Sequence, residues 1–152
     1  MNNVEAIIHR IKHITSPLDI DEELWLIEKI RMSNDFEVIR CGALAIYDHK
    51  INKGLPVLME KLRDPHTILR RDTLLFSCSE FECSKYFKLI FSLAISSKYS
   101  SAIEAVDLLE GNCNEVIEED ILWASCILNL MSPSELTPDQ CFIYKRLCEI
   151  IM

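Results

Sequence analysis

The sequence predicts an all-α fold. Apolar residues recur at intervals of three and four along most of the chain, which places them on one face of a helix. No segment alternates apolar and polar residues at the period of two that a half-buried strand requires. The 152 residues include only three glycines and five prolines, and a strand-rich fold needs more turn residues than that. We therefore expect helices joined by short loops.

Nine helical segments are expected, and most begin at residues that commonly cap or start a helix. The segments cover residues 3–14, 20–32, 35–50, 55–63, 65–78, 80–97, 101–110, 114–131 and 138–151. The predicted starts, from the second segment onward, are Asp19 with Glu22, Asn34 with Glu37, Gly54 with Pro56, Asp64 with Pro65, Ser79 with Glu82, Ser101 with Glu104, Asn112 with Glu115, and Thr137 with Pro138 and Gln140. Gly111 should end the seventh segment in a left-handed conformation. The short loops should make successive helices antiparallel neighbours.

Two segments are apolar nearly all round. They are residues 86–95 (Y-F-K-L-I-F-S-L-A-I) and 121–131 (I-L-W-A-S-C-I-L-N-L-M). A helix without a polar face is usually buried in the middle of a domain, so we expect both to lie in the core. The second is the longest candidate for a membrane span, and it is far too short for one.

The composition is that of a folded protein in a reducing compartment. Apolar residues make up 49% of the chain, enough for a sizeable core, and we expect one domain over residues 1–152. The seven cysteines are odd in number. The opening residues M-N-N-V-E-A-I-I-H-R lack the pattern of a secretory signal. We therefore expect a cytoplasmic protein with free thiols.

The charge is concentrated near one end of the chain. Residues 1–98 carry 14 basic and 14 acidic residues, whereas residues 99–152 carry 2 basic and 10 acidic residues, so the last third accounts for the whole net charge of −8. Nucleic acids and anionic membranes attract basic surfaces, so neither is expected as a partner. An acidic surface favours a basic partner.

A two-helix unit recurs in the first half. When residues 54–76 are aligned with residues 24–46 at a shift of 30, Asp64 falls on Asn34 and Arg70 on Arg40. Each unit thus has a capping residue between its helices and an arginine six residues later. A helix pair cannot bury its apolar face alone, so repeated pairs should stack. We expect Arg40 and Arg70 to bridge to the capping residues of neighbouring units.

This pattern resembles the HEAT-repeat family. In that family a proline lies in the first helix, an aspartate eight residues later opens the second, and a basic residue follows six residues after that; Pro56, Asp64 and Arg70 match all three. The unit at 24–46 keeps only the cap and the arginine, and a weaker unit at 87–109 has Glu104 in place of the arginine. The resemblance covers residues 20–110 and implies a right-handed solenoid of helical hairpins.

No catalytic, cofactor or metal site is expected. His9 and His13 have a spacing that can hold a metal, but no further ligand accompanies them except Glu5. Cys78 and Cys83 are five residues apart, and no C-x-x-C motif occurs. The three glycines form no phosphate-binding loop, and no G-x-S-x-G turn presents a serine nucleophile. Packed thiols and surface histidines are the simpler interpretation, and we expect no enzyme.

Seven acidic residues within 17 positions are the candidate binding surface. They are Glu104, Asp107, Glu110, Glu115, Glu118, Glu119 and Asp120. Acids near a helix start favour the helix dipole by about 0.3–1 kcal/mol each, which explains part of the cluster. Few basic residues compensate the rest, so a cationic partner would relieve their repulsion.

A small acidic helical-repeat protein of this kind is similar to the bacterial immunity proteins. Those proteins block the active site of a cognate toxin, often a nuclease, in contact-dependent growth inhibition and related systems. The resemblance implies that one copy of this chain binds one copy of a basic toxin domain, with carboxylates imitating phosphate.

The sequence is also compatible with two other functions. A general HEAT-like scaffold would bind peptides in its concave groove, holding several partners more weakly. A HEAT-like DNA glycosylase would need a basic groove with aromatic residues, to which Arg40, Arg70, Arg71 and Trp25 could contribute. The zero net charge of residues 1–98 disfavours the glycosylase.

Overall fold

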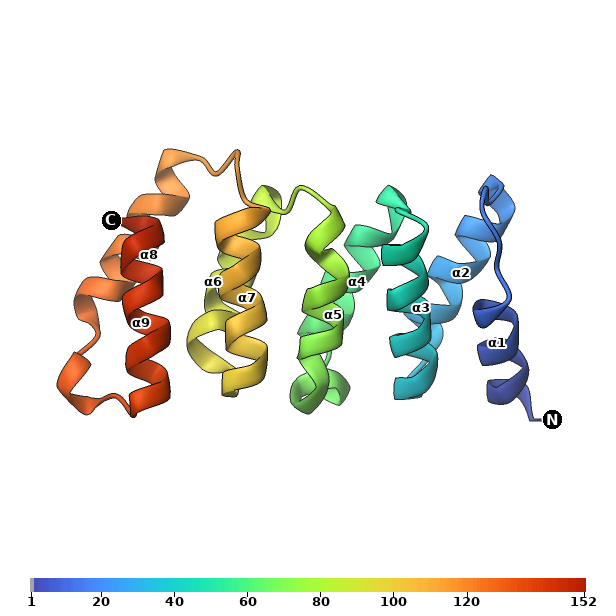
Figure 1. Ribbon diagram of the computed structural model, residues 1–152, viewed down its shortest axis with the longest axis horizontal. Helices are drawn as coiled ribbons and strands as arrows, with labels where there is room; N and C mark the ends of the chain where they lie inside the picture. Colours follow the sequence, from blue (N-terminus) through green and yellow to red (C-terminus); the bar gives the residue numbers. More distant parts are fainter. Residues whose placement is uncertain (1) are drawn as a thin grey trace. The chain divides into compact units, whose positions relative to one another are not determined.

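The computed structural model describes residues 2–152, and these residues contain nine α-helices and no strand (Figure 1). The helices are α1 (Asn3–Lys12), α2 (Ile20–Met32), α3 (Phe36–Asp48), α4 (Leu55–Arg63), α5 (Arg71–Ser77), α6 (Phe87–Ser96), α7 (Tyr99–Gly111), α8 (Glu118–Leu130) and α9 (Pro138–Ile151). The predicted all-α class and the predicted number of helices are therefore confirmed. The contacts divide the chain into an N-terminal unit ending at Phe81 and a C-terminal unit beginning at Glu82.

The N-terminal unit has two layers of helices. In one layer α3 packs between α1 and α5, and in the other α2 packs beside α4. Buried residues from both layers meet in the core, among them Leu26, Ile30, Ile46, Leu58 and Leu74. Each of these side chains belongs to the apolar stripe of an amphipathic helix. Such a helix can bury its stripe only against a neighbouring helix.

Two glycines allow the layers of this unit to approach closely. A Cβ atom added at Gly42 would lie 2.4 Å from Cγ1 of Ile30, and one added at Gly54 would lie 2.6 Å from Cδ1 of Ile46. Real Cβ atoms do not approach other carbon atoms so closely. Both glycines are therefore explained by packing rather than by turn geometry.

Several predicted helix starts are confirmed, and one is wrong by a single residue. The Asp19 carboxylate accepts a hydrogen bond of 2.8 Å from the Glu22 backbone N–H at the start of α2. Thr137 and Gln140 form the expected capping box of α9. Asp35, not Asn34, caps α3 by accepting from Val38 N–H at 3.1 Å. Both residues are good caps, so the sequence alone could not separate them.

The segment predicted as one helix over 65–78 is divided. Asp64 caps it by accepting from the His66 backbone N–H at 2.9 Å, but residues Pro65–Arg70 form a 3-10 helix before α5 begins. The Thr67 hydroxyl is buried and donates to the carbonyls of Lys61 and Asp64, which holds the chain in this tighter turn.

The expected arginine bridges between capping residues are wrong. Arg40 donates to Glu37 of its own helix, and Arg70 lies over the Phe36 ring at 4.6 Å. The connection between the two helix pairs is made by Lys61 instead. Lys61 is only 5% exposed, and its Nζ donates to the Ser33 carbonyl at 2.8 Å, at the carboxyl end of α2. A cation there is favoured by the helix dipole.

The C-terminal unit also has two layers, with α6 beside α8 and α7 beside α9. Phe87, Ile90 and Phe91 of α6 are fully buried. Phe91 meets Trp123 of α8 edge-on, with ring centroids 5.5 Å apart. The prediction that this segment is a core helix is therefore confirmed, although α6 begins at Phe87 and its polar residues Lys88 and Ser92 are exposed.

Three predicted helix starts from Ser79 onward are wrong. Ser79 and Asn112 begin no α-helix, since α6 starts at Phe87 and α8 at Glu118. Ser101 lies inside α7 and is completely buried. No described glycine has a positive φ, so Gly111 does not end α7 in the left-handed conformation.

The hydrogen bonds of Glu82 explain why no α-helix begins at Ser79 or Asn112. Its carboxylate accepts from the Ser84 hydroxyl, from the Asn114 backbone N–H at 3.1 Å and from the Asn114 side chain at 3.2 Å. It thereby joins the segment before α6 to the loop after α7, instead of closing a capping box with Ser79. The sequence spacing that indicated the box did not reveal a partner 32 residues away.

The prediction that residues 121–131 are buried all round is wrong. Of the 13 residues of α8, only Ala124 and Leu128 are buried, whereas Leu122 is 59% and Leu130 85% exposed. Helix α8 contacts α6 and α9 on one side, so its other side stays open within the C-terminal unit.

Candidate interaction surface

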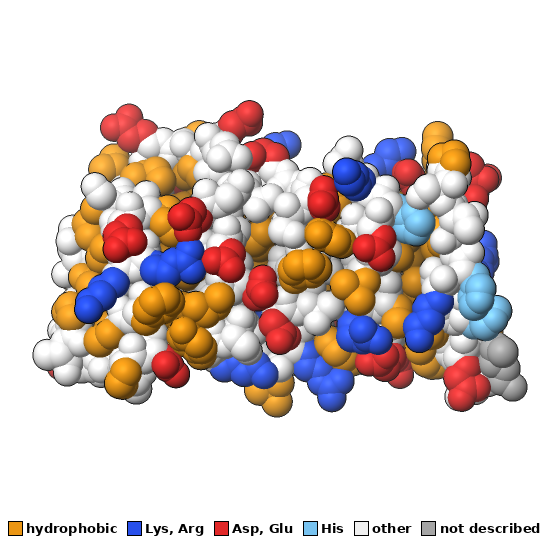
Figure 2. All heavy atoms as spheres, viewed as in Figure 1, with side chains coloured by type: hydrophobic (Ala, Val, Ile, Leu, Met, Phe, Trp, Pro, Cys, Tyr) orange, Lys and Arg blue, Asp and Glu red, His pale blue; other side chains and the backbone are white. Residues whose placement is uncertain are grey.

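Two of the predicted acidic residues are held by an arginine of the same unit. Arg146 of α9 donates from Nη1 to Asp107 Oδ1 at 3.0 Å and from Nη2 to Glu110. Burial lowers the pKa of the Arg146 guanidinium, but hydrogen bonds to the two carboxylates outweigh it, and the pKa is raised overall. Over α7 and α9, Figure 2 shows acidic and basic side chains side by side rather than one acidic patch.

Asp120 is also paired inside the unit. Its side chain is 18% exposed, and Oδ1 lies 3.5 Å from Nζ of Lys88 on α6. The same ammonium group lies 5.4 Å from the centre of the Trp123 ring. Asp120 therefore contributes to the α6–α8 packing and is largely turned away from solvent.

The remaining predicted acids divide by exposure. Glu104 is half-buried in α7 and has interactions of its own, whereas Glu115, Glu118 and Glu119 are exposed. No ion pair within residues 2–152 engages these three carboxylates. Of the seven acidic residues predicted to bind a partner, Glu115, Glu118 and Glu119 are thus the ones whose carboxylates are exposed and in no ion pair.

Glu118 and Glu119 share an exposed face with apolar residues. Helical spacing places both of them on the same side of α8 as Leu122, Cys126 and Leu130, opposite the buried Ala124 and Leu128. We name these five residues the α8 face: Glu118, Glu119, Leu122, Cys126 and Leu130. Helix α8 contains no lysine or arginine, so the face combines apolar area with uncompensated negative charge.

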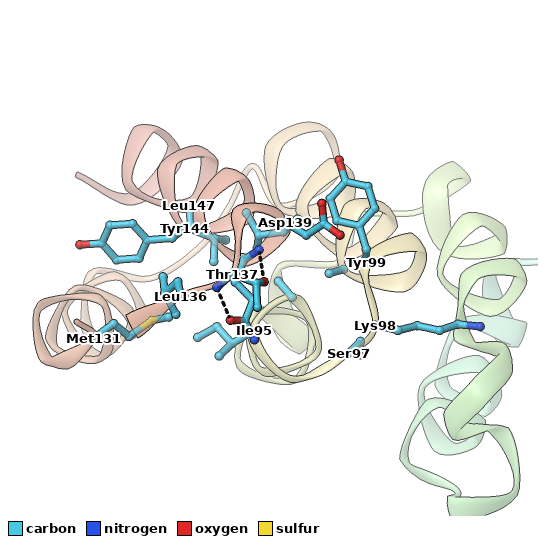
Figure 3. Close-up of a pocket in the computed structure, with 14 residues that line it drawn as sticks. Ile95, Ser97, Lys98, Tyr99, Met131, Leu136, Thr137, Asp139, Tyr144 and Leu147 are labelled. Carbon is cyan, nitrogen blue, oxygen red and sulfur yellow. Dashed lines mark hydrogen bonds between the residues drawn. The ribbon is translucent and has the colours of Figure 1, made fainter. Parts of the chain in front are cut away.

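A pocket of about 320 Å³ lies elsewhere in the same unit. The connection between α6 and α7, the segment between α8 and α9, and the first turns of α9 surround it (Figure 3). Its floor is apolar and includes the buried residues Ala94, Ala102, Ile143 and Leu147. Sequence reasoning did not find it, because its lining residues are scattered over 54 positions of the chain, from Ala94 to Leu147.

The histidines and cysteines form no metal site in the part of the chain that the structure describes. His9 and His13 stack with ring centroids 4.1 Å apart, and His13 Nδ1 lies 2.7 Å from the His9 carbonyl oxygen. Cys78 and Cys83 are both buried. Burial raises the pKa of the Cys83 and Cys113 thiols to about 12, so neither is activated as a nucleophile.

The residues considered for a basic nucleic-acid groove make other contacts. Trp25 lies under the Arg10 guanidinium at 3.8 Å, and Arg40 pairs with Glu37. Burial lowers the pKa of the Arg71 guanidinium. Of these groups, the Arg40 guanidinium is neutralised by an ion pair, and the Trp25 ring is covered by Arg10 and so is not free to stack on a base.

No family model matches this chain, and no curated protein or solved structure matches it. In residues 2–152, no helix combines the length and the apolar character needed to cross a bilayer.

Proposed function

We propose that this chain is a protein-interaction module that binds a basic protein through the α8 face. The observation that carries the proposal is the exposure of α8. A helix whose sequence is apolar nearly all round buries only Ala124 and Leu128, and leaves Leu122 and Leu130 in solvent beside two unpaired glutamates. Exposed apolar residues grouped on one face are typical of interaction sites.

The charge of the C-terminal unit favours a basic partner. From Glu82 to the end, the chain carries 11 acidic and 5 basic residues, which is a net charge of −6, whereas the N-terminal unit carries 13 acidic and 11 basic residues, a net charge of −2. Complementary charge accelerates association and disfavours acidic competitors. Apolar contact with Leu122 and Leu130 would then slow dissociation.

We further propose that the chain is a HEAT-like solenoid of helical hairpins and that it acts as an immunity protein. The two-layered helix pairs and the Pro56, Asp64 and Arg70 pattern support the solenoid. The free carboxylates of Glu115, Glu118 and Glu119 support a partner with phosphate-binding surface, such as a toxin nuclease, because carboxylates compete for the same cationic groups.

Affinity purification of the tagged chain from its native host, followed by native mass spectrometry, tests the proposal. One stoichiometric basic partner is expected. The double variant Glu118→Lys/Glu119→Lys should lose it, whereas the control Glu135→Lys, an exposed acid on another element, should keep it. Several substoichiometric partners would favour a scaffold, and bound nucleic acid would contradict the proposal.

The choice of variant follows from the ion pairs. Reversing Asp107 or Glu110 would place a lysine against Arg146 and disturb the contact between α7 and α9. Glu118 and Glu119 are in no ion pair, so their reversal breaks no internal ion pair. Both lie in the first turn of α8, where an acid favours the helix dipole by about 0.3–1 kcal/mol, so a melting curve must show that the double variant is folded.

A further inference from the structure

The pocket in the C-terminal unit carries an inference that rests on the proposed function and names a side chain of the partner. Its volume, about 320 Å³, is at the small end of the range of roughly 300–1,000 Å³ for ligand sites. Ile95, Leu136 and Met131 add apolar wall to the buried floor. An occupant must therefore offer apolar surface to the interior.

The polar side chains around the pocket differ in their availability. Thr137 and Gln140 are engaged with each other: Gln140 accepts from the Thr137 N–H at 2.9 Å, and the Thr137 hydroxyl accepts from the Gln140 N–H at 3.2 Å (dashed lines, Figure 3). Lys98 points away from the pocket in the same view. Asp139 is exposed, and no ion pair within residues 2–152 engages it.

Aromatic surface lies beside this carboxylate. Tyr99 lines the pocket on the side toward which Asp139 extends (Figure 3). Tyr99 is 43% exposed and Phe142 is 48% exposed, and the centroids of their rings lie 6.4 Å apart. A cation held near a carboxylate and an aromatic ring gains from both, by charge pairing and by cation–π attraction.

We propose that this pocket receives a lysine or arginine side chain of the protein partner, with its methylene stem on the apolar floor and its charged head at Asp139 and Tyr99. Lysine and arginine stems commonly cover apolar surface while their heads stay in water. A neutral apolar side chain would leave Asp139 unpaired, and an acidic side chain would be repelled by it. The pocket thus adds a specific contact to the attraction of the acidic unit.

The test uses a probe that does not require the partner. N-acetyl-arginine methylamide is titrated into the uniformly ¹⁵N-labelled full chain, and the amide chemical shifts are followed by NMR. We expect saturable shifts for residues 94–102 and 136–147, and weaker ones with N-acetyl-norleucine methylamide. Asp139→Asn should weaken arginine binding about 1.4- to 5-fold, the range for an exposed charge pair. Glu149→Gln, on the same helix but outside the pocket, is the matched control.

Three outcomes overturn the inference. They are no shift in the pocket residues at the solubility limit of the probe, equal binding of the norleucine compound, or unchanged binding in Asp139→Asn. A melting curve of each variant shows that it is folded. When a partner has been isolated, unchanged affinity of Asp139→Asn for it would refute the pocket contact and leave the proposed function standing. Failure to isolate any basic partner would refute the proposed function, whatever the probe does.

Discussion

Leu128 and Leu130 provide a sharp test of how α8 lies in the C-terminal unit. The two leucines are two positions apart on one helix, and the sequence around them is apolar on every side. In the structure, Leu128 is completely buried and Leu130 is 85% exposed. Truncation of each to alanine should therefore have very different effects on stability.

The expected magnitude follows from burial. A buried leucine contributes about 1.5–3 kcal/mol by transfer from water, and the cavity left by Leu128→Ala raises the loss to about 2–5 kcal/mol. Leu130→Ala removes a side chain already in solvent, so its effect should stay within about 0.5 kcal/mol. For a chain of this length, 1 kcal/mol shifts the melting temperature by roughly 2–4 °C, so Leu128→Ala should melt about 4–20 °C lower.

Circular dichroism at 222 nm during heating, together with urea unfolding at 25 °C, measures both variants against the parent. Leu122→Ala on the same exposed face is a second control and should resemble Leu130→Ala. If Leu130→Ala proved as destabilising as Leu128→Ala, α8 would be buried on both sides. The proposed interaction face would then not exist.

Three further predictions concern contacts inside the unit. Arg146→Gln removes the ion pairs with Asp107 and Glu110; because both carboxylates are more than half exposed, we expect a loss of about 1 kcal/mol that shrinks in 1 M salt, measured by urea unfolding. Ser101→Ala removes a buried hydroxyl that has no hydrogen-bond partner among the described residues, so stability should be unchanged or higher; a clear loss would mean that the hydroxyl is bonded. The pKa of Glu82 is lowered, chiefly by the hydrogen bond from Ser84, so its carboxylate stabilises the fold above its ordinary pKa of about 4.5, and this contribution is lost as the pH falls through the lowered value. Glu82→Gln should therefore be less stable than the parent at pH 7 and approach it in acid, and a difference independent of pH would contradict this.

The sequence predicted the helices well because their signals are local. Apolar spacing and caps such as Asp19 and Thr137 act within a few residues, and the start of α2 and the capping box of α9 are where these signals place them. The errors occur where a distant contact competes with a local rule. Glu82 bonds to Asn114 rather than closing a capping box, and Ser101 is buried within α7 rather than capping it.

The candidate site was predicted only in part for the same reason. Composition indicates that the last third is acidic, but it does not indicate which carboxylates are paired. Arg146 is 39 positions from Asp107, and Lys88 is 32 positions from Asp120, so neither pairing follows from helical spacing. The exposure of α8 could not be predicted from the sequence either, because an apolar helix has the same residue pattern whether it lies in the core or at an interface.

Cys126 offers the most direct measurement of the central claim, because it lies on the α8 face and is exposed in the described chain. Its rate of alkylation by iodoacetamide can be followed by mass spectrometry in the free chain and in the affinity-purified complex, with the buried Cys41 and Cys78 as unlabelled references. We predict rapid alkylation in the free chain and strong protection when the basic partner is bound. Equal rates in the two states would show that the partner binds elsewhere and would contradict the proposed role of the α8 face.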